Sequence, residues 1–209
     1  MKFNKEQIFT ETWFDSMIPL WEGLAEQIKS NEYKIKSVLE VGCYEGRATS
    51  FICEKILEDK GDVTVVDTFG GSTIETGMIG TDERKKDNEN FIYENFIHNI
   101  SFYPQINFSV EKGFSNIILP KLFLENKNYD LIYIDASHKS DDTFVDAYYC
   151  SKMLNVNGLM IFDDFGWKDP NKEHLVYSPE AGIRFFEMMY NENYSLVYSG
   201  YQAIFQKTS

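Results

Sequence analysis

Residues 36–46 read Lys-Ser-Val-Leu-Glu-Val-Gly-Cys-Tyr-Glu-Gly, and this segment indicates the class of the whole chain. Its apolar run, Val38 to Val41, is typical of a buried parallel strand. Gly42 allows a sharp turn, and Gly46 allows the backbone to come close to a bulky group. A helical pattern follows from Ala48 to Glu58. Strand, glycine turn and helix together predict a nucleotide-cofactor cradle at the carboxyl end of a first strand.

The glycine spacing distinguishes between two kinds of cofactor. The pattern is Gly-x-x-x-Gly, without the middle glycine that a dinucleotide pyrophosphate needs for close approach of the backbone. Glu40, near the end of the strand, suits a cationic ligand better than an anionic one. A nicotinamide-dependent oxidoreductase shares this kind of sheet, but both features count against it.

A second acidic residue follows a second apolar run. Asp67 comes directly after Val63–Val66, and an acid at the tip of the second strand is where this kind of fold holds a ribose through its two hydroxyls. The motif Glu-Val-Gly-Cys-Tyr-Glu-Gly, followed by Asp67, resembles the first motif of class I S-adenosylmethionine (SAM) methyltransferases. This resemblance implies that SAM is the cofactor.

Composition limits the partners that we expect. The chain has 209 residues, 43% of them hydrophobic, and predicts one globular domain over residues 1–209. Its net charge of −13 argues against nucleic acid and anionic membrane surfaces, because both require basic patches. We see no membrane-length apolar run and no signal peptide near Met1. The cysteines Cys43, Cys53 and Cys150 lack metal-ligand spacing, so a reduced, cytoplasmic protein is expected, and we interpret Cys43 as a small space-filling residue. A homodimer is left open.

Apolar runs alternate with helical patterns along the rest of the chain. We expect Ser115 and Ser140 to be the N-caps of two helices. Further strands are expected at 106–110, 131–134 and 159–162, helices at 90–102, 141–153 and 181–190, and a hairpin formed by 195–198 and 203–206. The prediction is an α/β, Rossmann-like, doubly wound sheet of seven strands, mostly parallel with a C-terminal antiparallel hairpin, with helices on both faces.

Two segments are candidates to enclose the site. Residues 1–30 predict a helical cap with an apolar stripe, which either packs on the sheet or roofs the site through Trp13, Phe14 or Trp21. Residues 70–88 are rich in glycine and charge, and we expect a lid or an acceptor-binding loop, with a solvated insertion as the alternative. Three residues are candidate acceptor contacts: Trp13 in the first segment, Ser72 in the second, and Trp167 shortly after the strand predicted at 159–162.

Acidic residues follow three of the predicted strands. Asp67, Asp135 and the pair Asp163-Asp164 each stand at a carboxyl end, where ligands bind in open α/β sheets. Carboxylates that converge without basic neighbours repel one another, and a divalent cation relieves the repulsion. Oxygen ligands favour Mg²⁺ or Mn²⁺ over zinc.

A second resemblance concerns the chemistry. The motif Asp-Ala-Ser-His at 135–138, followed by Asp163-Asp164, is similar to metal-dependent O-methyltransferases of the catechol type and closer to the macrolide-sugar enzymes of the macrocin type. This resemblance implies Asp135, Asp163 and Asp164 as metal ligands, and His138 as the base, where the catechol type has a lysine. The catalytic residues are then His138 and Asp135. The implied SAM-binding residues are Glu40, Gly42, Cys43, Tyr44, Gly46, Asp67, Thr68, Gly113, Phe114, Ser115 and Asp135, of which those at 113–115 lie beside the adenine.

The sequence therefore predicts a SAM-dependent O-methyltransferase whose acceptor is a small molecule or glycan, with a sugar hydroxyl favoured. A divalent metal would orient the acceptor, and neutral His138 would accept its proton. Two alternatives stay open. One is a metal-independent methyltransferase with a phenolic or other acceptor, and the other is a non-catalytic SAM-binding partner protein.

Overall fold

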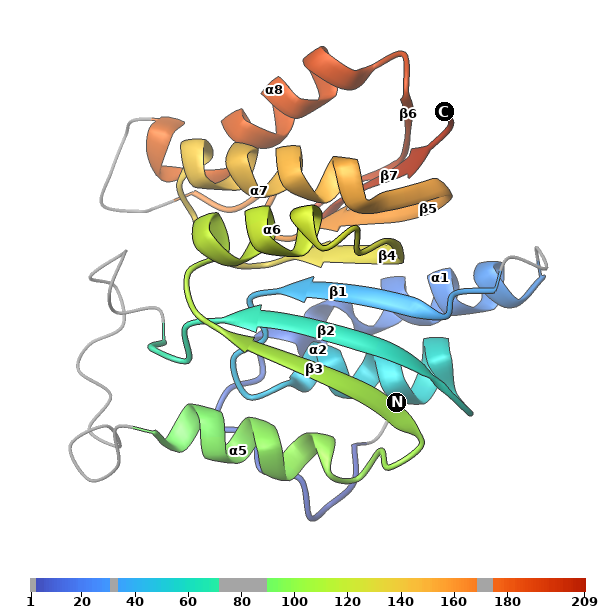
Figure 1. Ribbon diagram of the computed structural model, residues 1–209, viewed down its shortest axis with the longest axis vertical. Helices are drawn as coiled ribbons and strands as arrows, with labels where there is room; N and C mark the ends of the chain where they lie inside the picture. Colours follow the sequence, from blue (N-terminus) through green and yellow to red (C-terminus); the bar gives the residue numbers. More distant parts are fainter. Residues whose placement is uncertain (1–2, 31–33, 72–89, 169–174) are drawn as a thin grey trace.

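The computed structural model describes residues 3–30, 34–71, 90–168 and 175–209. These residues form a seven-stranded sheet in the order β3-β2-β1-β4-β5-β7-β6, with helices on both faces (Figure 1). The predicted fold class is confirmed. In chain order the strands are β1 (Ser37–Val41), β2 (Gly61–Asp67), β3 (Ile106–Lys112), β4 (Tyr129–Ile134), β5 (Leu154–Phe162), β6 (Tyr194–Ser199) and β7 (Ala203–Lys207).

Strands β1 to β5 are parallel, and β7 and β6 add an antiparallel hairpin at one edge. The strand order reverses at β1, which pairs with β2 on one side and β4 on the other. The connections that leave β1 and β4 go to opposite faces of the sheet, so a crevice opens at the carboxyl ends of these strands. This crevice is where the acidic residues gather.

Side chains alternate along each strand between two apolar cores. Val38 packs in one core and Leu39 in the other. The first core is covered by η1 (Trp13–Met17), α1 (Ile18–Ser30), α2 (Arg47–Phe51), the π-helical η2 (Ile52–Leu57) and α5 (Phe91–Ile100). The second is covered by α6 (Ser115–Leu124), α7 (Ser140–Met153) and α8 (Pro179–Tyr190), which the short η3 (Leu175–Tyr177) precedes. Among the residues that the structure describes, no helix is both long enough and apolar enough to cross a membrane.

The predicted N-terminal helical cap starts later than expected. Helical structure begins at Trp13, and residues 3–12 have no regular helix. The reason lies in their hydrogen bonds, because the backbone amides of Ile8 and Thr10 donate to the side chains of Asn99 and Glu45. These partners replace the carbonyl groups that a helix would supply.

Three local predictions were wrong. Ser115 and Ser140 are the first residues of α6 and α7 and not their caps, and the cap residues before them make no side-chain cap bond. Strand β5 starts at Leu154 instead of 159, because its first residues already pair with β4. Asn157 lies inside this strand with a φ of 68°, where the register shifts.

Candidate active site

A cavity of about 500 Å³ opens at the carboxyl ends of β1, β2, β4 and β5. All the predicted cofactor residues except Gly46 line it. Gly46 instead precedes α2 with a φ of 79°, and a Cβ there would meet the Phe96 ring at 2.9 Å. The cavity therefore brings together residues from distant parts of the sequence, and Gly46 serves the packing of the turn beneath it.

Gly42 allows the tightest contact in this region. Its φ is 84°, and a Cβ built on it would lie 1.9 Å from the carbonyl oxygen of Asp135. Its amide donates to Val66 O on β2 at 2.8 Å, and the amide of Asp135 donates to Val41 O at 2.8 Å. The glycine turn is thus fixed between β2 and β4, and only glycine fits there without moving the backbone.

Asp67 fixes the next part of the same turn. Its Oδ2 accepts hydrogen bonds from the amides of Cys43 and Tyr44 at 2.7 and 2.8 Å, and its Oδ1 accepts from Phe69 at 2.6 Å. The carboxylate also lines the cavity, as the predicted ribose contact requires. Burial and the neighbouring acids raise the pKa of the Cys43 thiol well above its usual range, so this cysteine stays protonated, as its space-filling interpretation predicts.

Glu40 is a buried acid at the floor of the cavity. Its side chain is inaccessible to solvent, Oε2 accepts a hydrogen bond from Thr49 Oγ1 at 2.5 Å, and Oε1 finds no hydrogen-bond partner in the described ranges. Burial raises the pKa of Glu40 to about 8. A group in this state gains most from a cation, because a nearby positive charge offsets the cost of ionising it in a buried place.

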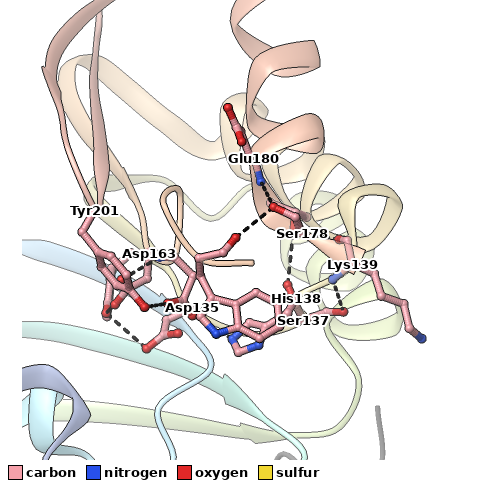
Figure 2. Close-up of polar contacts among 12 residues, drawn as sticks. Asp135, Ser137, His138, Lys139, Asp163, Ser178, Glu180 and Tyr201 are labelled. Carbon is pink, nitrogen blue, oxygen red and sulfur yellow. Dashed lines mark hydrogen bonds and ion pairs between the residues drawn. The ribbon is translucent and has the colours of Figure 1, made fainter. Parts of the chain in front are cut away.

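Asp135, His138 and Asp164 meet at the other end of the cavity. One ligand atom from each lies within 4.8 Å of the others, so the group is a candidate metal site. His138 Nε2 is 2.7 Å from Asp164 Oδ2, and the Tyr201 hydroxyl donates to Asp164 Oδ1 at 2.6 Å. Figure 2 shows Asp135, Asp163, His138 and Tyr201 converging at the strand ends. The two oxygens of Asp164 thus face two different partners.

Asp163 takes a different direction from Asp164. The Tyr133 hydroxyl donates to Asp163 Oδ2 and is 3.2 Å from Asp135 Oδ2, so this buried phenol lies between two carboxylates. Burial and the charge of Asp164 raise the pKa of Asp163 to about 6. Burial and the charge of Asp163 raise the pKa of Asp135 well above its usual range. Asp163 is absent from the candidate metal group of described residues, although the sequence predicted it as a ligand.

Trp167 forms part of the wall beside His138. The two ring centroids are 4.5 Å apart, and both residues line the cavity. The Ser178 hydroxyl, at the start of α8, donates to the Trp167 carbonyl at 3.0 Å and accepts from the amide of Glu180 (Figure 2). The N-terminal cap of α8 therefore holds the loop that carries this indole.

The structure separates the candidate acceptor contacts. Trp13 lines the cavity and its ring is 5.1 Å from that of Tyr44. Phe14 also lines it, whereas Trp21 is buried and donates to Gln202 at 2.8 Å. Ser72 lies outside the described residues, as does the predicted lid apart from residues 70 and 71.

Tyr133 and Tyr201 lie at the site although they were not predicted as site residues. Tyr133 had a readable signal, since it interrupts an aliphatic strand two residues before Asp135 and so shares its face. Tyr201 had none, because the β6–β7 hairpin that brings it to Asp164 is a long-range contact.

Comparisons with known proteins agree with this fold. A family model described as "Methyltransferase domain" matches residues 39–165. The solved structure of the O-methyltransferase TomG from Streptomyces achromogenes, in complex with SAM, is 14% identical with a TM-score of 0.61, and the match covers 91% of this chain and 80% of that chain.

Two further structures are similar at this level. The O-methyltransferase from Bacillus cereus, in complex with SAH, is 14% identical with a TM-score of 0.59, and covers 91% of this chain and 81% of that one. The methyltransferase MycE, in complex with Mg, SAH and mycinamycin VI, is 13% identical with a TM-score of 0.57, and covers 97% and 51%. At such identities the likeness concerns the fold. No curated protein matches the sequence significantly.

Proposed function

The chain belongs to the methyltransferase-domain family and is a SAM-dependent methyltransferase, and we propose that it transfers the methyl group of SAM to a hydroxyl oxygen of a sugar. His138 is the general base in this proposal. The observation that carries it is the pairing of His138 with Asp164 in the same cavity that the predicted SAM-binding residues line.

The His138–Asp164 pair suits proton removal from an alcohol. A hydroxyl is a weak nucleophile until it loses its proton. A proton on His138 Nε2, directed at Asp164 Oδ2, leaves Nδ1 as the nitrogen that accepts another. Asp164 then stabilises the imidazolium. The acceptor oxygen attacks the sulfonium methyl in line, the methyl–sulfur bond breaks, and the bonding electrons return to sulfur, which becomes neutral.

A divalent cation fits the same residues. The carboxylates of Asp135 and Asp164 lie in one group with His138, and burial and nearby acids raise the pKa of Asp135, a penalty that a cation would relieve. We propose that Asp135 and Asp164 hold Mg²⁺ or Mn²⁺, since Mg²⁺ is commonly bound by one or two carboxylates together with water. When bound, the ion would orient the acceptor hydroxyl and lower its pKa. The presence of Mg in the MycE structure supports this choice.

Aromatic walls and the charge of the cavity favour a neutral ring as the acceptor. Trp13, which is 55% exposed, and Trp167 both line the cavity, and flat indole faces suit the apolar face of a sugar. Arg47 is the only lysine or arginine among the described lining residues, and Asp15 binds it. This balance disfavours phosphorylated and carboxylated acceptors. The MycE structure, which contains mycinamycin VI, is consistent with a small-molecule acceptor.

One observation favours a second candidate, metal-independent transfer. Tyr133 donates to Asp163, and Tyr201 and His138 occupy the two oxygens of Asp164. Protein donors thus already satisfy these acids, and a His–Asp pair can act as a base without an ion. In that case Asp135 would contact the acceptor.

The proposal is tested by SAM binding and methyl transfer. Calorimetry measures SAM binding, and radiolabelled SAM reports transfer to neutral sugars, sugar phosphates and phenols, each with Mg²⁺, with Mn²⁺ or with EDTA. Transfer to a neutral sugar that EDTA abolishes and Mg²⁺ restores supports the full proposal. Transfer that is insensitive to EDTA supports the second candidate. Preferred transfer to phenols or sugar phosphates contradicts the acceptor class.

A further inference from the structure

The N-terminal residues before α1 are held against the cavity by side chains of other elements. We define residues 3–17 as the roof segment. The side-chain amide of Asn99, on α5, bonds both backbone groups of Ile8. Its Oδ1 accepts from the Ile8 amide and its Nδ2 donates to the Ile8 carbonyl, both at 2.7 Å. Glu45 accepts from the amide and hydroxyl of Thr10 at 2.6 and 2.9 Å.

Arg47 fixes the segment at two further points. Its Nε and Nη2 donate to the two carboxylate oxygens of Asp15 at 2.6 and 2.8 Å, a bidentate pair. Its guanidinium carbon lies 4.4 Å from the centroid of the Phe3 ring and 4.8 Å from that of Phe9. One planar side chain therefore sets both the beginning and the end of the roof segment.

The anchors stand beside the cofactor turn. Glu45 lies between Tyr44, whose amide binds Asp67, and Gly46, while Arg47 begins α2. Glu45 is 1% exposed although it is an acid. The roof segment, in turn, contributes Phe9, Glu11, Trp13 and Met17 to the cavity wall. The turn that carries predicted cofactor residues thus also holds these wall residues in place.

We propose that Glu45 and Arg47 are positioning residues that set the distance between the cofactor turn and the acceptor-facing rings of the roof segment, chiefly Trp13. The inference rests on the proposed function. A merely structural role predicts equal losses of stability, cofactor binding and acceptor binding. A positioning role predicts a selective loss of acceptor binding, because the network holds the roof segment while the turn keeps its own bonds to Asp67.

The first test breaks the Arg47–Asp15 pair without touching a cavity-lining side chain. Asp15→Asn is expected to raise the acceptor KM about tenfold while the Kd for SAM changes less than about twofold, since a misplaced wall costs orientation. Asp15→Glu, which keeps the carboxylate, should leave the acceptor KM close to that of the wild-type protein. Glu58→Gln is the matched control, because it removes a carboxylate from an exposed ion pair with Lys29. Equal effects of Asp15→Asn and Glu58→Gln on the acceptor KM would overturn the inference.

A double-mutant cycle tests whether the pair acts through Trp13. In a Trp13→Ala background, Asp15→Asn should raise the acceptor KM no further, whereas additive effects contradict the proposed route. Arg47→Lys, which keeps the charge but loses the planar fork, should resemble Asp15→Asn.

Failure of the proposed function gives a different result. If the wild-type protein binds SAM but methylates no acceptor, the proposed function fails, and amide hydrogen exchange then judges the positioning role. Residues 8–15 should exchange faster in Asp15→Asn than in Glu58→Gln. Equal exchange rates would overturn the inference by this route as well.

Discussion

The part of the cavity predicted to bind the cofactor, at the ends of β1 and β2, is held by backbone groups. The proposed catalytic part, at the ends of β4 and β5, is held by side chains. We call these parts the cofactor end and the catalytic end. At the cofactor end, Asp67 accepts from three backbone amides, and Gly42 lies against the Asp135 carbonyl. At the catalytic end, Asp164 is bound by His138 and Tyr201, which come from different parts of the chain. Backbone geometry is fixed by the sheet, but side-chain pairs exchange partners, so the two ends should respond differently to mutation, protons and cations.

The charges differ in the same way. The Asp67 carboxylate is satisfied by amide dipoles that cannot move away. Asp135 and Asp163 are buried. Burial and the charge of Asp163 raise the pKa of Asp135, and burial and the charge of Asp164 raise the pKa of Asp163. The cofactor end is therefore preformed, while the catalytic end depends on a proton or a cation to offset its charge. Glu40 is the exception at the cofactor end.

The comparison is tested most strongly by His138→Ala. Loss of the proposed general base should reduce methyl transfer about a thousandfold, while the Kd for SAM stays within about twofold because the other end keeps its backbone contacts. Single-turnover transfer and calorimetry measure the two quantities. A comparable loss of SAM binding would show that the two ends are not independent.

Gly42→Ala tests the preformed end. The added Cβ would collide with the Asp135 carbonyl oxygen at a φ of 84°, and we expect a loss of about 3 kcal/mol in the free energy of unfolding. Gly23→Ala is the matched control, because a Cβ at that position in α1 meets nothing within 4 Å. It should leave stability unchanged or raise it by up to about 1 kcal/mol. Urea unfolding measures both, and similar stabilities would contradict the role given to Gly42.

Asp164→Asn and Asp163→Asn distinguish the roles of the two consecutive acids at the catalytic end. The structure directs Asp164 at His138 and Asp163 at Tyr133. We expect Asp164→Asn to lower kcat at least about tenfold more than Asp163→Asn, because only the former loses the partner of the base and a proposed metal ligand. Transfer assays over a range of Mn²⁺ concentrations measure kcat and the apparent metal affinity. Equal losses of kcat in the two variants would support Asp163 as a metal ligand, as the sequence predicted.

Glu40 gives the smallest expected effect, a change in the pH dependence of stability. The pKa of Glu40 is about 8 in the folded protein, above its usual value of 4.5, so the folded state keeps a proton that the unfolded state has lost. Stability contributed by this proton is present below pH 4.5 and is lost as the pH rises toward 8. Glu40→Gln should therefore reduce the slope of unfolding free energy against pH in this window by up to about 1.4 kcal/mol per pH unit. An unchanged slope in urea titrations would contradict the raised pKa.

Much of the fold could be predicted because its signals are local. Apolar runs and glycine turns determine where strands end, and parallel strands place their carboxyl ends at one edge. The irregular path of residues 3–12 was missed, since its hydrogen-bond partners Asn99 and Glu45 are distant in sequence. Trp13 lines the cavity as expected, but its positioning by Arg47 through Asp15 had no sequence signal.

The sequence by itself determined the turn at the predicted cofactor end, because Gly42, Cys43 and Tyr44 are contiguous and Asp67 ends the adjoining strand. Only the tertiary structure decided how the two consecutive acids differ. Asp163 directly follows β5, and its amide still donates to Ile134 O at 2.9 Å, whereas Asp164 turns away with a φ of 54°. A left-handed backbone conformation at one position after a strand cannot be read from residue types. As a result, Asp164 pairs with His138, and Asp163 accepts the hydrogen bond of Tyr133.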